Sequence, residues 1–304
     1  MNTINFMGQR KLALVFSALL IIASIGSLAT RQLNWGLDFT GGTLVEVHYD
    51  STADLNAVRT TLVANGYGGA IVVSFGTDRD VLIRLPQGYS DEQGAELLGI
   101  LQREYAGIVE LRRIEFVGPQ VGDELREQGG LAMLMALGLV MLYIAFRFQF
   151  KFAVGAVVAL VHDVLITLGF FSIMNFEFDL TVLAALLAVI GYSLNDTIVV
   201  SDRIRENFRK IRRAEPVEVI NISLTETLGR TLVTSLTTLL VLTALAVFGG
   251  EIIHGFAVAL VVGVIIGTYS SIYVAANALL VMGVTKEDLM IPVKEGADQE
   301  ELAP

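Results

Sequence analysis

Six long runs of apolar residues dominate the hydrophobic pattern of the chain. They cover residues 12–29, 129–146, 152–174, 180–201, 231–248 and 256–284. Each run is close to the roughly 20 residues that an α-helix needs to cross a bilayer, and charged residues are concentrated between the runs. The pattern therefore predicts an α-helical membrane bundle of six transmembrane helices.

The first run is preceded by Arg10 and Lys11, which leaves two interpretations. Ser27-Leu28-Ala29 is an acceptable cleavage site for a signal peptide. The run of about 18 apolar residues is, however, longer than the core of a usual signal peptide and long enough to span a membrane. We interpret it as an uncleaved transmembrane helix.

The segment between the first two runs has the pattern of a folded domain. Alternation of Val45, Val47 and Tyr49 with Glu46 and His48 predicts a half-buried β-strand. Similar patterns complete the order βαββαβ, with further strands at 70–75, 80–85 and 111–117 and helices at 53–64 and 90–105. This order is typical of a small ferredoxin-like α+β domain.

Basic residues in the connections predict the orientation of the bundle. The regions 147–151 and 203–230 contain several Lys and Arg, whereas 175–179 and 249–255 contain acidic residues and no Lys or Arg. We therefore expect both termini in the cytoplasm. The expected division is a cytoplasmic N-terminus at 1–11, the first transmembrane helix at 12–30, a periplasmic domain at 31–128, helices two to six at 129–284 and an acidic cytoplasmic tail at 285–304.

Composition narrows the class of protein further. The chain has 304 residues, of which 54% are hydrophobic and 17% charged, which is too apolar for a soluble domain of this length. A formal net charge of −10 gives nucleic acid no electrostatic attraction. The sequence contains no cysteine, its 3 histidines are far apart, and it has no phosphate-binding loop or Gly-x-Ser-x-Gly motif. We expect neither an enzyme nor a bound cofactor or metal.

Asp196 and Arg230 are the most promising pair for chemistry. Asp196 lies inside the fourth apolar run, where a lone carboxylate costs several kcal/mol to bury, and Arg230 precedes the fifth run. Because consecutive helices are antiparallel, the two residues are expected at similar depth. A carboxylate facing an arginine can ionise and one moved away takes up a proton, which is the elementary step of a proton-coupled machine. The alternative is a static ion pair, with Arg230 extending to the interface.

Three further residues are candidates for the same proton path. Asn195 precedes Asp196, and Thr234 shares a helix face with three other threonines and with Arg230. Both side chains could support the path by holding water, although threonines often bond back to their own helix. Asp163, near the middle of the third run, either extends a relay or locks helix packing through a neutral hydrogen bond.

Small residues recur at every fourth position along the sixth run. This ridge would let another helix approach closely, either inside the bundle or on a partner subunit. Its members are Gly255, Ala259, Gly263, Gly267, Ser271 and Ala275.

Short motifs follow one another along nearly the whole chain. They are Trp35-Gly36-Leu37-Asp38-Phe39-Thr40-Gly41-Gly42, Val117-Gly118-Pro119-Gln120-Val121-Gly122, His162-Asp163, Gly191-Tyr192-Ser193-Leu194-Asn195-Asp196, Asp202-Arg203-Ile204-Arg205-Glu206, Arg230-Thr231 with Thr234-Ser235, Gly249-Gly250 and Gly267-Thr268-Tyr269-Ser270-Ser271. Together they make the chain similar to the SecD/SecF family of the bacterial Sec protein-export machinery, within the RND superfamily. The resemblance implies half of an RND-type transporter, completed by pairing with SecD, with proton-path residues at Asp196 and Arg230.

The resemblance also implies a function and its partners. It implies an auxiliary subunit in the inner membrane that uses the proton-motive force to promote export of pre-proteins. It implies association with the SecYEG channel and leaves YajC and YidC as additional candidates. Two other functions stay open, namely a proton-driven exporter of a small solute or lipid, with a substrate cleft in the outer domain, and a passive scaffold. The coupling ion, H⁺ or Na⁺, is open as well.

Overall fold

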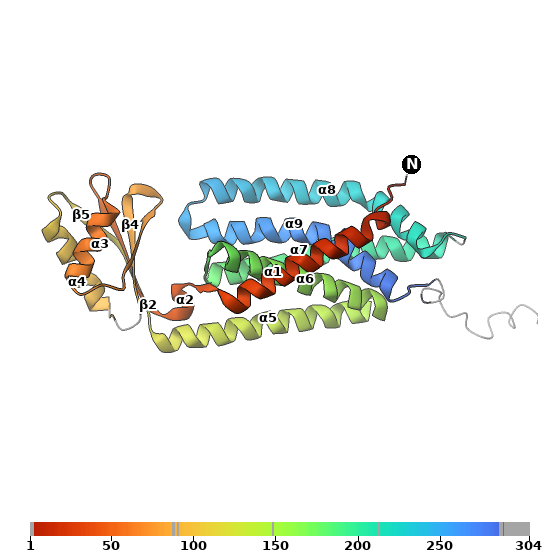
Figure 1. The fold of residues 1–304 in the computed structure, drawn as a ribbon, viewed down its shortest axis with the longest axis horizontal. Coiled ribbons are helices and arrows are strands. Elements are labelled where there is room, and N and C mark those ends of the chain that lie inside the picture. Colours follow the sequence, from red (N-terminus) through yellow and green to blue (C-terminus); the bar gives the residue numbers. More distant parts are fainter. Residues whose placement is uncertain are drawn as a thin grey trace, which may run out of the picture.

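A bundle of long helices carries a small sheet domain at one end in the computed structural model, and the N-terminal end of the chain lies at the other (Figure 1). The structure describes residues 3–86, 89, 91–147, 149–211, 213–285 and 288. Except for Thr285 and Asp288, the acidic tail expected at 285–304 lies outside the described residues.

Six helices in the described part of the chain are long and apolar enough to cross a membrane, which confirms the predicted bundle. Several continue beyond the apolar runs, because the hydrophobic pattern marks the part of a helix that suits a bilayer and polar residues can extend it. The helix α5 thus begins at Pro119, and α7 continues past Ser201. The bounds are α1 Arg10–Thr30, α5 Pro119–Arg147, α6 Phe150–Met174, α7 Leu180–Lys210, α8 Pro216–Phe248 and α9 Glu251–Val281, with a short 3₁₀ turn η1 at Met7–Gln9.

The sheet domain has the predicted βαββαβ order. Its elements are β2 Gly42–Tyr49, α3 Leu55–Ala64, β3 Ile71–Phe75, β4 Thr77–Leu85, α4 Asp91–Glu104 and β5 Val109–Val117. The strand order β3-β4-β2-β5, with antiparallel neighbours, is that of a ferredoxin-like fold. Val45 of the central strand pairs with Ile83 on one side and Ile114 on the other. The helices α3 and α4 cover the face of the sheet that points away from the bundle (Figure 1).

Helix α9 packs against α7 through its glycines. A Cβ at Gly263 would lie 2.1 Å from Cγ2 of Val189, and a Cβ at Gly267 would lie 3.1 Å from Cβ of Ser193. A Cβ at Gly255 would lie 3.1 Å from Cγ2 of Val182. Residue numbers rise together along the two helices, so α7 and α9 are parallel. The fifth small residue of the ridge, Ser271, is fully buried.

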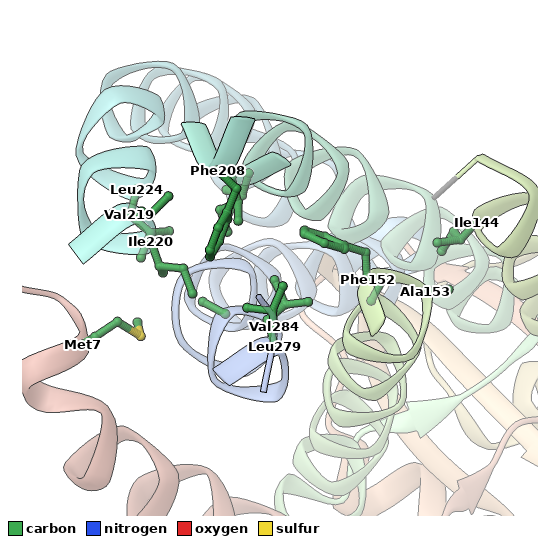
Figure 2. Packing of buried hydrophobic residues seen from close by; sticks show 14 residues of the cluster. Met7, Ile144, Phe152, Ala153, Phe208, Val219, Ile220, Leu224, Leu279 and Val284 are labelled. Carbon is green, nitrogen blue, oxygen red and sulfur yellow. The ribbon is translucent and has the colours of Figure 1, made fainter. Parts of the chain in front are cut away.

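A large apolar core fills the end of the bundle farthest from the sheet domain. Figure 2 shows side chains from α6, α7, α8 and α9 pointing toward one another, with Met7 approaching from the N-terminal turn. Phe152, Phe208, Ile220 and Leu279 are all at most 3% exposed. This core fixes the far end of α7, the helix that carries Asp196.

The joint between bundle and sheet domain was not predicted from the hydrophobic pattern. Strand β1 (Asn34–Trp35) pairs in parallel with β6 (Glu177–Phe178), and the short helix α2 (Leu37–Thr40) leads into β2. Gly42 has φ +135°, and a Cβ there would lie 2.4 Å from the carbonyl oxygen of Leu85. Only glycine fits this close approach, which starts the sheet domain.

Candidate functional site

Asp196 is buried in the bundle, and none of the described residues forms a hydrogen bond with its side chain. Its side chain is on α7 and is 4% exposed, and its Oδ2 atom is unpaired among the described residues. The hydroxyls of Thr197, next in sequence, and of Thr231 on α8 are also buried and unpaired there. Native proteins pair nearly all buried polar atoms, so unpaired oxygens mark a place where function rather than stability selects the residues.

Hydrogen bonds fix the register of α7 against α8 on both sides of Asp196. Tyr192 Oη donates to Ser235 Oγ at 3.4 Å, and Arg203 Nε donates to Glu226 Oε2 at 2.7 Å. The helices are antiparallel, so the residues from Arg230 to Thr234 lie at the level of Asp196. Asp196 and Arg230 therefore lie at a similar level along the bundle.

Among the described residues, Arg230 makes no ion pair with Asp196. Its side chain is exposed on the surface of the bundle, and none of the described residues forms an ion pair with it. The static ion pair considered from the sequence is thus absent from this structure. The carboxylate of Asp196 is therefore not neutralised by an ion pair with Arg230 in this structure.

The two supporting residues are placed differently from Asp196. Asn195 is exposed on α7, with no side-chain hydrogen bond among the described residues. Thr234 donates to the carbonyl oxygens of Arg230 and Thr231, both at 3.0 Å, so it bonds back to its own helix. Neither side chain contacts Asp196 through a hydrogen bond in this structure.

Asp163 lies in a separate buried cluster, and its surroundings were largely missed from the sequence. Its Oδ1 atom is 2.8 Å from His162 Nδ1, and its Oδ2 atom accepts hydrogen bonds from Ser193 at 2.5 Å and Ser270 at 2.7 Å. These contacts join α6 to α7 and α9. Ser193 and Ser270 stand in motifs noted in the sequence, but no spacing rule pairs them with Asp163.

The N-terminal end of α7 is held by acidic side chains from the joint. The carboxylate of Asp38 accepts a hydrogen bond from the backbone N–H of Leu180 at 3.0 Å, and Asp179 accepts one from Val182 at 2.8 Å. Negative charge at a helix N-terminus complements the helix dipole. Asp38 belongs to the segment between α1 and the sheet domain, so this contact ties α7 directly to that segment.

Among the residues that the structure describes, one ion pair crosses from the sheet domain to the bundle. Arg84 Nη2 on β4 lies 2.5 Å and 2.6 Å from the two carboxylate oxygens of Glu177, which precedes α7. Beside it, Trp35 packs edge-on against Phe39 and Phe178, and the guanidinium of Arg126 stacks 4.5 Å above the Trp35 ring. The start of α7 is therefore fixed to the sheet domain by an ion pair, and to β1, α2 and α5 of the joint by aromatic packing.

A cavity of about 460 Å³ lies between the open face of the sheet and the bundle. Apolar residues of the strands line it together with polar and charged residues, including Val73, Leu82, Arg84, Glu177 and Thr181. At this cavity the sheet domain could hold a ligand against the bundle. No cluster of metal-ligating side chains occurs among the described residues.

Comparison with known families gives two matches within the chain. A family model for the C-terminal part of the protein-export membrane proteins SecD and SecF matches residues 100–285. A second model, for the SecD/SecF GG motif, matches residues 26–53, which include Gly41 and Gly42.

Curated proteins and solved structures agree with these matches. The protein translocase subunit SecF of Vibrio alginolyticus is 54% identical over 99% of this chain and 97% of its own length. The protein translocase subunit SecF of Pseudomonas aeruginosa is 54% identical over 96% of this chain and 95% of its own length. The crystal structure of SecDF from Thermus thermophilus, a translocon-associated membrane protein, superposes with a TM-score of 0.83 at 39% identity. It covers 92% of this chain, which spans 39% of the SecDF length. A super-membrane-facing form of SecDF gives a TM-score of 0.71 at 37% identity.

Proposed function

The chain belongs to the SecF family of protein translocase subunits, and from that premise we propose that it uses the proton-motive force to promote protein export across the cytoplasmic membrane. Asp196 is the protonatable group, and Arg230 biases its charge state. The unpaired, buried carboxylate of Asp196 carries this proposal. The ferredoxin-like domain lies on the outer side and both termini lie in the cytoplasm, as the distribution of basic residues indicates.

Proton uptake at Asp196 changes the attraction between α7 and α8. An ionised carboxylate is drawn toward Arg230, whereas a protonated one is released. The far half of α7 is fixed in the apolar core and by Arg203, which pairs with Glu226 on α8. Movement of α7 against α8 is therefore transmitted toward its other end, where Asp38 and the Arg84–Glu177 pair connect it to the sheet domain.

The exposed faces of the bundle support a partner that completes it. Large apolar side chains are exposed along α1, α5 and α8, such as Phe16, Leu139 and Leu240. Exposed Asn195 and Arg230 interrupt the lipid-compatible surface of α7 and α8, which a bilayer alone would leave unsatisfied. We assign this polar strip to the contact with SecD. The resulting complex acts at the SecYEG channel. YajC and YidC are further candidates for association.

Export by reconstituted vesicles tests the proposal. The chain is purified together with its SecD partner and placed in vesicles with the channel and its ATPase, and pre-protein uptake is measured under an imposed pH gradient and, separately, under a sodium gradient. We expect stimulation by the pH gradient. Equal export with and without either gradient would exclude ion-coupled function, and stimulation by sodium alone would identify Na⁺ as the coupling ion.

The cavity beside the sheet favours one other candidate, export of a small solute or lipid. Its 460 Å³ and mixed lining suit a small amphipathic molecule. If this function is correct, bulky substitutions in the cavity, such as Val73→Trp, abolish export of the small molecule. That export also proceeds without any pre-protein. Normal pre-protein export by the Val73→Trp variant would exclude the cavity from the exported chain's path.

A further inference from the structure

A cluster of buried and half-buried hydrogen bonds, which we call the His162 cluster, connects four helices on the sheet-domain side of Asp196. Its members are Ser17 on α1, His162 and Asp163 on α6, Ser193 on α7, and Tyr269 and Ser270 on α9. His162 and Asp163 are 3% and 0% exposed. Ser193 precedes Asp196 by three positions, so the two side chains share one face of α7 and lie one turn apart.

The direction of each hydrogen bond follows from one fixed point. The Tyr269 hydroxyl lies 2.7 Å from the carbonyl oxygen of Ala13, which can only accept, so Tyr269 donates there. Ser17 Oγ, at 2.9 Å, must then donate to the Tyr269 oxygen. Because the Ser17 proton is used, His162 Nε2 must donate to Ser17 Oγ at 3.1 Å.

This assignment determines the protonation of the next contact. With a proton on His162 Nε2, the 2.8 Å contact between Nδ1 and Asp163 Oδ1 needs one more proton between the two atoms. The proton is either on Nδ1, giving an imidazolium beside a carboxylate, or on Oδ1, giving a neutral pair. In both forms His162 and Asp163 together hold one proton more than a neutral histidine and a carboxylate, and their net charge is zero.

The remaining contacts stabilise the carboxylate of Asp163 that is left when the proton is released. Ser193 and Ser270 both donate to Asp163 Oδ2, so the carboxylate left behind keeps two hydrogen bonds. Tyr269, whose ring stacks 6.1 Å from that of His162, is the other titratable side chain that contacts the pair among the described residues. The helices α1 and α7 contribute the hydroxyls of Ser17 and Ser193, which do not titrate.

We propose that His162 and Asp163 form a second proton site, which holds one proton between them and passes it to Asp196. This inference rests on the proposed role of Asp196. The proton leaves the space between Nδ1 and Oδ1, and the carboxylate of Asp196 takes it up. His162 then remains neutral with its proton on Nε2, and Asp163 remains as a carboxylate bound by Ser193 and Ser270. The unpaired Oδ2 atom of Asp196, one turn along α7 from Ser193, is the acceptor.

An asparagine at position 163 separates this role from helix packing. Its amide nitrogen donates to a neutral His162 at Nδ1, and its amide oxygen accepts from Ser193 and Ser270, so every contact of the cluster is kept. Only the ability to hold and release a proton is lost. A purely structural cluster tolerates Asp163→Asn.

The test compares Asp163→Asn with Asp196→Asn in the complex with SecD, reconstituted with the channel. We expect both variants to assemble and to lose stimulation of export by a pH gradient. We also expect an infrared pH titration of the wild-type complex to show a protonation change that Asp163→Asn removes. Ser270→Ala should change the pH of that transition, whereas Ser271→Ala, a buried neighbour whose hydroxyl bonds only its own helix, should not.

The outcomes separate the two proposals. Gradient-stimulated export by Asp163→Asn together with a defect in Asp196→Asn overturns the second proton site and leaves Asp196 in its role. Stimulated export by both variants overturns the proposed function as well. If Asp163→Asn does not assemble, an unchanged infrared transition in Ser270→Ala overturns the proposal.

Discussion

Arg84 of the sheet domain and Glu177 of the bundle form an ion pair with both carboxylate oxygens within 2.6 Å of one guanidinium nitrogen. The pair lies immediately before α7, and Glu177 also belongs to the two-stranded sheet that joins the domains. It is the charged contact that ties movement of α7 most directly to the sheet domain.

Neutralising Glu177 should therefore uncouple the domains. We expect Glu177→Gln to assemble and to retain export without a gradient, while losing much of the stimulation by a pH gradient. Exchanging the charges, with Arg84→Glu and Glu177→Arg in one chain, should restore part of it. Arg79→Ala on the same strand is the matched control, since Arg79 has no ion pair among the described residues. Equal stimulation in all variants would show that the pair does not couple the domains.

The contact between Gly263 and Val189 predicts a packing defect. A Cβ at position 263 would lie 2.1 Å from Val189, and valine has little rotamer freedom in a helix with which to move away. We expect Gly263→Ala to lower the free energy of unfolding by about 1–3 kcal/mol, the usual effect of overpacking. Thermal unfolding of the purified chain in detergent measures it.

Two further variants identify the cause of that defect. Val189→Ala in the Gly263→Ala background should restore part of the stability, because it removes the clashing methyl groups. Gly130→Ala, where a Cβ meets nothing within 4 Å, should not destabilise the chain. An equal loss of unfolding free energy in Gly130→Ala would mean that the Gly263→Ala defect does not come from the contact between α9 and α7.

These contacts show where sequence reasoning succeeds. Apolar length gives the six helices, and alternation at residues 45–49 gives the first strand of the sheet domain, because both patterns are local. The residues of the joint are not local in this sense. Arg84 and Glu177 are brought together only by the tertiary fold, and strand β1 is too short for its periodicity to be seen.

The candidate site divides in the same way. Asp196 could be singled out because a carboxylate in an apolar run is costly, and its depth relative to Arg230 follows from helix order. The absence of an ion pair could not be predicted, because it depends on the rotation of α8, which leaves Arg230 exposed. The two serines that bond Asp163 come from two distant parts of the chain, α7 and α9, so these hydrogen bonds could not be read from the sequence either.

The sheet domain has a pH-dependent contact at the end of β2. Hydrogen bonds from the Tyr105 hydroxyl at 2.8 Å and from the Ile108 backbone N–H at 3.2 Å lower the pKa of Asp50 from its ordinary 3.8. Because the pKa is lower in the folded state, this stabilisation is present above pH 3.8 and is lost as the pH falls through the folded-state pKa. We expect Asp50→Asn to destabilise the domain at pH 7 and to make little difference in strong acid.

Hydrogen exchange of the sheet-domain amides in the full chain measures this difference. Protection of wild type and Asp50→Asn should differ at neutral pH and converge below pH 3.8. Asp54→Asn is a control, since asparagine can replace Asp54 as the cap of α3. A difference at Asp50 that stays constant across this range would contradict the assigned role of its charge.

The central claim is that Asp196 couples export to the proton gradient by taking up and releasing a proton. The most direct measurement is pre-protein export into vesicles that contain the assembled complex with Asp196→Asn, with and without an imposed pH gradient. Asparagine keeps the shape of the side chain and removes its titration. The account predicts export at the rate that wild type shows without a gradient, unchanged when the gradient is applied. Stimulation of Asp196→Asn to the wild-type extent would contradict it.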